Sequence, residues 1–242
     1  MSANSIKEIK DSLAKIRPYI VTTPTFQTLS FGQRIDLKLE QLQYTGSFKC
    51  RGAFNSLLDN EKAKQGVVAA SGGNYGAAVA YAAQKLGIKS HIFVPELSGK
   101  TKIELIKRTG ARLTIVPGTY AEALEAANKH QKETGAVSIH AYDSRKTIIG
   151  QGTLFCEWEN QGLEADTIMI AVGGGGLISG AMSWFQKIDG SVVAASTLTN
   201  TQTRTLRHTR TRNITHNKTH TMEHLRARKH INKSSCNMQR LE

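Results

Sequence analysis

Apolar and polar residues follow two different periods along the first part of the chain. Residues 5–17 carry apolar side chains three or four positions apart, which is typical of an amphipathic helix. Ser5 and Glu8 stand in the capping-box relation at the start of this helix. Residues 34–40 instead alternate between apolar and polar side chains, which predicts a strand.

From residue 66 onward, short apolar runs are each followed by a segment with helical spacing. The predicted strand and helix pairs are 67–70 with 75–86, 89–94 with 100–109, 112–116 with 120–134, 136–141 with 146–161, and 167–172 with 177–188. This alternation predicts an α/β fold of mostly parallel strands with helices on both faces. In such sheets, ligands bind beyond the carboxyl ends of the strands.

Two glycine-rich turns come directly after predicted strands and before predicted helices. The first is Ser71-Gly72-Gly73-Asn74, and the second is Gly173-Gly174-Gly175-Gly176, which Leu177 follows. A helix N-terminus offers free backbone N–H groups and the positive end of the helix dipole, so each turn could bind a carboxylate or a phosphate. Each turn taken alone could equally be a plain connection between a strand and a helix.

A lysine after a small-residue turn is the third feature. Lys49 follows Gly46-Ser47-Phe48 and precedes a segment with helical spacing. Such a lysine can form a Schiff base with an aldehyde, but in a chain with 32 Lys and Arg an ordinary solvated lysine is the simpler interpretation of Lys49 alone. Arg51 is expected to be solvated or paired with an acidic helix face rather than catalytic.

Taken together and in this order, the three motifs resemble those of the fold-type II pyridoxal-phosphate enzymes. Within that family the chain looks most like the branch of serine/threonine dehydratases (threonine ammonia-lyases) and serine racemases. The motifs are Ser47-Phe48-Lys49-x-Arg51-Gly52-Ala53, Ser71-Gly72-Gly73-Asn74-Tyr75 and Gly173-Gly174-Gly175-Gly176-Leu177. The resemblance covers about residues 5–193.

The resemblance implies a role for each motif. Lys49 would hold pyridoxal 5'-phosphate covalently, Phe48 would lie near its ring, and Asn74 would hydrogen-bond the ring hydroxyl. The phosphate would bind at Gly173, Gly174, Gly175, Gly176 and Leu177, and the substrate carboxylate at Ser71, Gly72, Gly73 and Asn74. The fold implied is the two-domain, tryptophan synthase β-like one. Residues 1–65 and 147–193 would form a larger, incomplete cofactor-binding domain, and residues 66–146 a smaller α/β domain.

The reaction implied is that of an ammonia-lyase, which converts L-threonine or L-serine to a 2-keto acid and ammonia by β-elimination. Racemases of this family carry an acid/base serine where this chain has Gly72, so elimination is favoured over racemisation. Three alternatives stay open: a cysteine-synthase-like enzyme, a serine racemase, or an inactive remnant whose basic tail binds polyanions. Small amino acids are the expected substrates, and a complete chain is expected to form a homodimer.

The composition changes near residue 194. Residues 191–242 contain ten Lys and Arg against two Asp and Glu, so 8 of the chain's 13 net positive charges lie there. A basic segment can bind nucleic acid through phosphate neutralisation, and its five histidines could bind metal, but their spacing matches no regular site. We favour a third interpretation, in which residues 194–242 are a disordered, low-complexity tail with no role in nucleic-acid binding.

The remaining residue types exclude several classes of protein. The three cysteines, Cys50, Cys156 and Cys236, stand far apart with no Cys-x-x-Cys pair, so neither a disulfide framework nor a metal site is expected. No apolar run is long enough to cross a membrane, and the first residues lack the apolar stretch of a signal peptide. The expectation is a soluble, cytoplasmic protein.

Overall fold

The computed structural model describes residues 4–30, 32–58, 60–185 and 191–196. These residues all belong to one compact unit that spans positions 1–208. Its helices are α1 (Asn4–Ile16), α2 (Lys49–Leu57), α3 (Asn74–Lys85), α4 (Lys100–Lys107), α5 (Tyr120–Thr134), α6 (Arg145–Asn160) and α7 (Gly176–Trp184). Its strands are β1 (Thr25–Ser30), β2 (Gln33–Lys38), β3 (Val67–Ala70), β4 (Ser90–Pro95), β5 (Arg112–Val116), β6 (Val137–Ser138), β7 (Thr167–Val172) and β8 (Ser191–Ser196).

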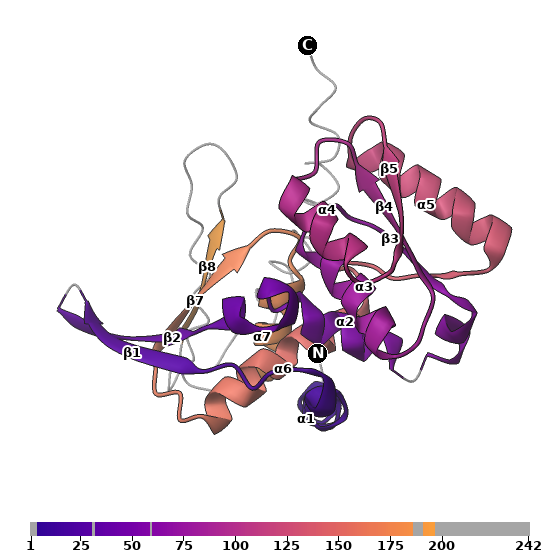
Figure 1. Cartoon of the computed structure of the whole chain (residues 1–242). Helices are drawn as coiled ribbons and strands as arrows, with labels where there is room; N and C mark the ends of the chain where they lie inside the picture. Colours follow the sequence, from indigo (N-terminus) through magenta and orange to yellow (C-terminus); the bar gives the residue numbers. More distant parts are fainter. Residues whose placement is uncertain (1–3, 31, 59, 186–190, 197–242) are drawn as a thin grey trace, which may run out of the picture. The chain divides into compact units, whose positions relative to one another are not determined.

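A four-stranded parallel sheet carries one helical layer on each face. Its strand order is β5-β4-β3-β6, and α3 and α4 lie on one side of it with α5 on the other (Figure 1). Successive side chains of each strand point to opposite faces of the sheet, as in any pleated strand. Val67 and Ala69 of β3 belong to the core that includes α3, whereas Val68 packs against Ala123 and Ala127 of α5. The α/β class and the parallel strands predicted from the sequence are confirmed.

Two smaller sheets complete the described part of the chain. The strands β7 and β8 pair in parallel, and β1 and β2 form an antiparallel hairpin that projects as the indigo arm of Figure 1. The sequence predicted neither β1 nor β8. In β1, exposed side chains such as Leu29 break the pattern of a half-buried strand. The strand β8 runs through Ser196 into the segment predicted as a tail, and residues 197–242 lie outside the described residues.

The helices α2, α6 and α7 approach one another closely at glycines. A Cβ atom on Gly150 of α6 would lie 2.7 Å from the Cα atom of Gly52 in α2. On the other side of α6, a Cβ atom on Gly180 of α7 would lie 2.7 Å from the backbone nitrogen of Gly152. Since real Cβ atoms do not approach this closely, only glycine allows these crossings. The glycines therefore set the position of α2, whose first residue is Lys49.

A pair of histidines links the sheet to α5. His91 of β4 is buried, and its Nδ1 atom lies 3.1 Å from Nε2 of His130, while its Nε2 atom lies 2.8 Å from Oγ1 of Thr114. Burial lowers the pKa of His91 to about 4, and the nearby His130 and Arg112 act in the same direction. This agrees with the position of His91 in a predicted strand, where a histidine is more often a core residue than a ligand.

The lowered pKa of His91 predicts that the fold loses stability in mild acid. Because the unfolded chain binds this proton near pH 6.5 and the folded chain only near pH 4, the free energy of unfolding should fall as the pH drops between these values. We expect a loss of about 1–2 kcal/mol, measured by urea denaturation at pH 7 and pH 5. The variant His91→Gln should lose this part of the pH dependence. The exposed His140→Gln should retain it, and equal pH dependence in the two variants would contradict the assignment.

Candidate functional site

The amine of Lys49 lies between two aromatic rings at the start of α2. Its Nζ atom is 5.1 Å from the centre of the Phe48 ring and 5.8 Å from that of the Tyr75 ring. It also donates a hydrogen bond to the carbonyl oxygen of Ala141, at 3.3 Å. The turn before the helix is tight, because both Thr45 and Gly46 have positive φ angles. Lys49 is therefore half-buried and held, unlike a solvated surface lysine.

Burial lowers the pKa of Lys49 below its usual value. Desolvation disfavours the charged ammonium, and within the described residues no carboxylate pairs with it to restore the charge. A larger share of the amine is then neutral at physiological pH. The neutral amine is the form that attacks a carbonyl carbon and accepts a proton, so this environment suits both nucleophilic and base chemistry.

A buried cluster of two cationic and two anionic side chains anchors α2 two residues beyond Lys49. Arg51 is fully buried and donates to both carboxylates of the cluster, with contacts of 2.8 Å to Glu40 and 2.8 Å to Glu157. Lys38 of β2 also donates to Glu157, at 2.6 Å. The side chains of the cluster are at most 11% exposed. Of the two expectations for Arg51, solvation is wrong, whereas pairing with acidic residues is found. Glu157 belongs to helix α6, and Glu40 belongs to the turn after β2.

The four-glycine turn lies at the carboxyl end of β7 and opens α7. Gly173 and Gly174 are exposed, and an added Cβ atom on Gly173 would meet nothing within 4 Å. On Gly174 it would lie 2.5 Å from the ring of Tyr142. Gly175 adopts a φ of 84°, a conformation that glycine reaches at little cost. The turn thus leaves its backbone accessible on one side and packs against Tyr142 on the other.

The turn after β3 has its own hydrogen bonds. Ser71 donates its N–H to the carbonyl of Phe93 at 2.9 Å, and its hydroxyl accepts the N–H of Gly73 at 3.3 Å. A Cβ atom on Gly76 would lie 2.1 Å from the carbonyl oxygen of Ser71, so this helix start requires glycine there. Gly73 and Asn74 are exposed at the N-terminus of α3. A ligand can therefore approach the start of α3 at these two residues.

The structure connects Lys49 to both turns through neighbouring residues. Tyr75, whose ring lies beside the amine, directly follows Asn74. Ala141, which accepts the hydrogen bond of the amine, directly precedes the Tyr142 that packs on Gly174. Within the described part of the chain, Lys49 Nζ makes no hydrogen bond to either turn itself. Leu177 lies behind the second turn, where it packs against the core around α6 and α7.

Sequence reasoning missed the segment Ala141–Tyr142. A signal for it was present, because the predicted strand 136–141 ends there and ligands of parallel sheets collect at the carboxyl ends of strands. The strand itself is shorter than predicted, with only Val137–Ser138 in the sheet, so the residues after it are free to turn toward Lys49. By contrast, no local pattern pointed to Glu40 and Glu157 as partners of Arg51.

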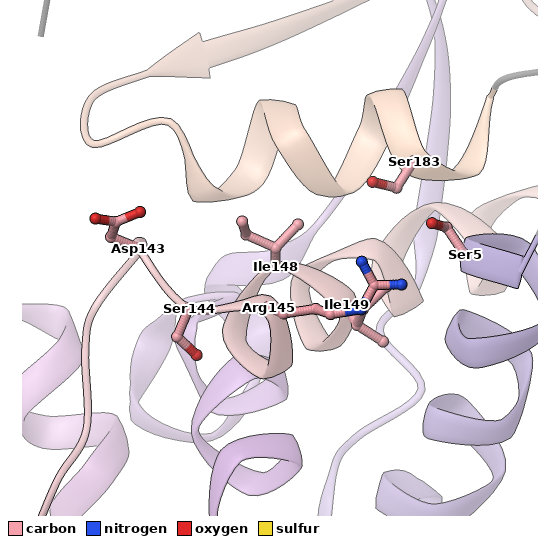
Figure 2. Close-up of a pocket in the computed structure, with 7 residues that line it drawn as sticks. All are labelled: Ser5, Asp143, Ser144, Arg145, Ile148, Ile149 and Ser183. Atoms are coloured by element: carbon pink, nitrogen blue, oxygen red, sulfur yellow. The ribbon is translucent and has the colours of Figure 1, made fainter. Parts of the chain in front are cut away.

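A cavity in the described residues has a lining that does not include Lys49. It has a volume of about 170 Å³ and lies among α1, α6 and α7 (Figure 2). The residues that line it are Ser5, Asp143, Ser144, Arg145, Ile148, Ile149 and Ser183. None of the residues predicted from the sequence is among them. The guanidinium of Arg145, which lines this cavity, already forms an ion pair with Glu8 of α1 at 2.7 Å.

The chain is similar to a known family and to several known proteins. Residues 16–241 match the family described as pyridoxal-phosphate dependent enzyme. The chain is 37% identical over 196 residues to serine racemase of Oryza sativa subsp. indica, and 34% identical over 195 residues to L-threonine dehydratase catabolic TdcB of Staphylococcus aureus (strain USA300). Each match covers 78% of this chain but only 58% and 56% of the relative's length.

Solved structures agree with these matches. The structure of maize serine racemase superposes with a TM-score of 0.75 at 38% identity, covering 78% of this chain and 60% of that one. The processed form of threonine deaminase isoform 2 from Solanum lycopersicum gives a TM-score of 0.74 at 30% identity, covering 81% and 56%. The chain therefore belongs to the pyridoxal-phosphate-dependent enzyme family. The predicted family, fold class and cofactor are confirmed.

The residues present fit the family's cofactor. An aldehyde needs a neutral amine, and burial favours this form of Lys49. A phosphate needs accessible backbone N–H groups, and Gly173 and Gly174 are exposed residues at the start of α7. In the described residues, no group of His, Cys, Asp and Glu could hold a metal ion, and no helix is long and apolar enough to cross a membrane.

The buried charge cluster leads to a prediction about stability. Arg51→Met keeps most of the side-chain volume but leaves Glu40 and Glu157 buried without their main partner, so the free energy of unfolding should fall by about 3–5 kcal/mol. Arg145→Met removes an exposed ion pair with Glu8 and should cost less than about 1 kcal/mol. Urea denaturation of both variants measures the difference. Similar losses in the two would mean that the cluster does not anchor α2.

Proposed function

We propose that this chain uses pyridoxal phosphate, bound through Lys49, to eliminate the β-hydroxyl of L-serine or L-threonine and form a 2-keto acid and ammonia. The observation that carries the proposal is the half-buried Lys49 amine, which has a lowered pKa and adjoins both glycine-rich turns through Tyr75 and Ala141–Tyr142. When bound, pyridoxal phosphate supplies an electron-withdrawing ring that makes the Cα–H of an attached amino acid acidic.

Each part of the site has a distinct task in this proposal. The N–H groups at Gly173, Gly174, Gly175 and Gly176 bind the phosphate, and Leu177 packs behind them. Phe48 lies beside the ring, and the side chain of Asn74 binds the ring hydroxyl. The turn formed by Ser71, Gly72 and Gly73 binds the substrate carboxylate at the start of α3 and so orients Cα. Among its backbone N–H groups, that of Gly72 makes no hydrogen bond within the described residues and can donate to the carboxylate. The Nζ atom of Lys49, favoured in its neutral form, accepts the proton from Cα.

Racemisation is the competing function. Relatives named serine racemase and relatives named threonine dehydratase match the chain about equally well. Elimination is favoured because residue 72 is a glycine and has no side chain of its own that could move a proton. The chain resembles both kinds of relative, so the choice between the two functions rests on this position.

The Lys49→Ala variant tests cofactor attachment. The purified chain mixed with pyridoxal phosphate should show a visible absorption band of a protein-bound imine, because the neutral amine of Lys49 condenses with the aldehyde of the cofactor. The variant should lack the band. Lys146→Ala, which removes a lysine from α6, is the control and should keep it. A band of the same strength in Lys49→Ala would rule out this lysine as the attachment residue.

The products formed from L-serine distinguish elimination from racemisation. Pyruvate should accumulate faster than D-serine, because Lys49 supplies the one proton-transferring side chain that the proposed site assigns to Cα. Pyruvate is measured by a coupled reductase assay, and D-serine by chiral chromatography of the same samples. Faster formation of D-serine would instead establish the racemase as the function of the chain.

A further inference from the structure

The side chain of Ser98 occupies the space beside Gly72. A Cβ atom built on Gly72 would lie 1.6 Å from Oγ of Ser98 and 2.4 Å from its Cβ atom. These separations are far shorter than any non-bonded contact, so residues 72 and 98 cannot both place a side chain there. Gly72 is not among the glycines with positive φ, so its backbone does not require glycine. Ser98 is the nearest neighbour that excludes a side chain from position 72.

The position of Ser98 is set by the loop between β4 and α4. Its N–H donates to the carbonyl of Pro95 at 3.0 Å, which closes a tight turn after the strand. Val94 of the same strand lies against the same space, with its Cγ1 atom 3.0 Å from the added Cβ. The N–H of Ser71 is bonded to the carbonyl of Phe93, so strand β4 holds both the loop and the glycine turn.

The hydroxyl of Ser98 is a donor at this turn that no described residue engages. The hydroxyl of Ser71 accepts the N–H of Gly73, which holds it within the turn. Ser98 is half-buried, and among the described residues its Oγ atom has no hydrogen-bond partner. A hydroxyl that no protein group engages is free to donate to a ligand in place of water. The carboxylate proposed to bind at this turn is such a ligand.

We propose that the Ser98 hydroxyl donates a hydrogen bond to the substrate carboxylate and is a specificity-determining residue of this site. The inference rests on the proposed function, because it takes the turn Ser71–Asn74 as the carboxylate site. It extends that site to a residue from a different loop. A hydrogen bond from a hydroxyl to a charged carboxylate is stronger than one between two neutral groups. Loss of this hydrogen bond should therefore weaken binding of an amino acid by about tenfold or more.

Steady-state kinetics of the holoenzyme test the role of Ser98. Ser98→Ala should raise KM for L-serine by about tenfold and change kcat by less than about threefold, because the carboxylate is held equally before and during reaction. Ser90→Ala, at the opposite end of β4, is the matched control and should leave both constants unchanged. A fall in kcat with an unchanged KM would overturn the proposal, since the hydroxyl would then act in proton transfer.

Thermal unfolding tests the shared space without any measurement of activity. Gly72→Ala should lower Tm in the chain that carries Ser98, because the new methyl group meets the hydroxyl. In the Ser98→Gly background the same substitution should cost little, so the two changes should be strongly non-additive. An equal loss of Tm in both backgrounds would show that Ser98 does not fill this space, and the proposal would fall.

Measuring how L-serine changes Tm tests the role of Ser98 independently of the proposed reaction. If the holoprotein forms no keto acid but L-serine raises its Tm, and raises it less in Ser98→Ala, the reaction is wrong and the role of Ser98 stands. If L-serine raises Tm equally in both proteins, the role of Ser98 is wrong whatever the reaction. If L-serine has no effect on the unaltered chain, both proposals are overturned.

Discussion

The buried cluster of Arg51, Glu40, Glu157 and Lys38 is the constraint on which the arrangement of the site depends. Charges out of water are tolerated only when each finds a partner in good geometry, and here two cations meet two carboxylates with almost no exposure. The cluster joins β2, the turn after it, α2 and α6. Because any shift of α2 would separate these partners, Lys49 at the start of that helix is held in place.

In the rest of the site, glycines allow close packing because they leave space for neighbouring side chains. Gly52 lets α2 cross α6, Gly72 accommodates the hydroxyl of Ser98, and Gly174 accommodates the ring of Tyr142. At each of these places an added Cβ atom would lie within 2.5 Å of a neighbouring side chain. The glycine content of the motifs therefore reflects close packing as much as backbone conformation or anion binding.

Most of the elements could be predicted, because each is short and its buried face repeats at a local period. The bounds predicted for β5, α5 and β7 agree with the structure to the residue. The errors occur where burial is not periodic. The strand β1 is largely exposed, and Arg51 is a charged residue buried by partners 11 and 106 positions away. Contacts between residues so far apart cannot be predicted from a short stretch of sequence.

The sequence by itself determined the α/β class, the order of the three motifs and, through them, the family and its cofactor, since local periods and short motifs suffice for these. Only the tertiary structure decided what surrounds Lys49, which residue fills the space at Gly72, and that Arg51 is buried. The physical reason is the range of the contacts. The amine of Lys49 meets a carbonyl 92 positions away, and folding alone brings the two together.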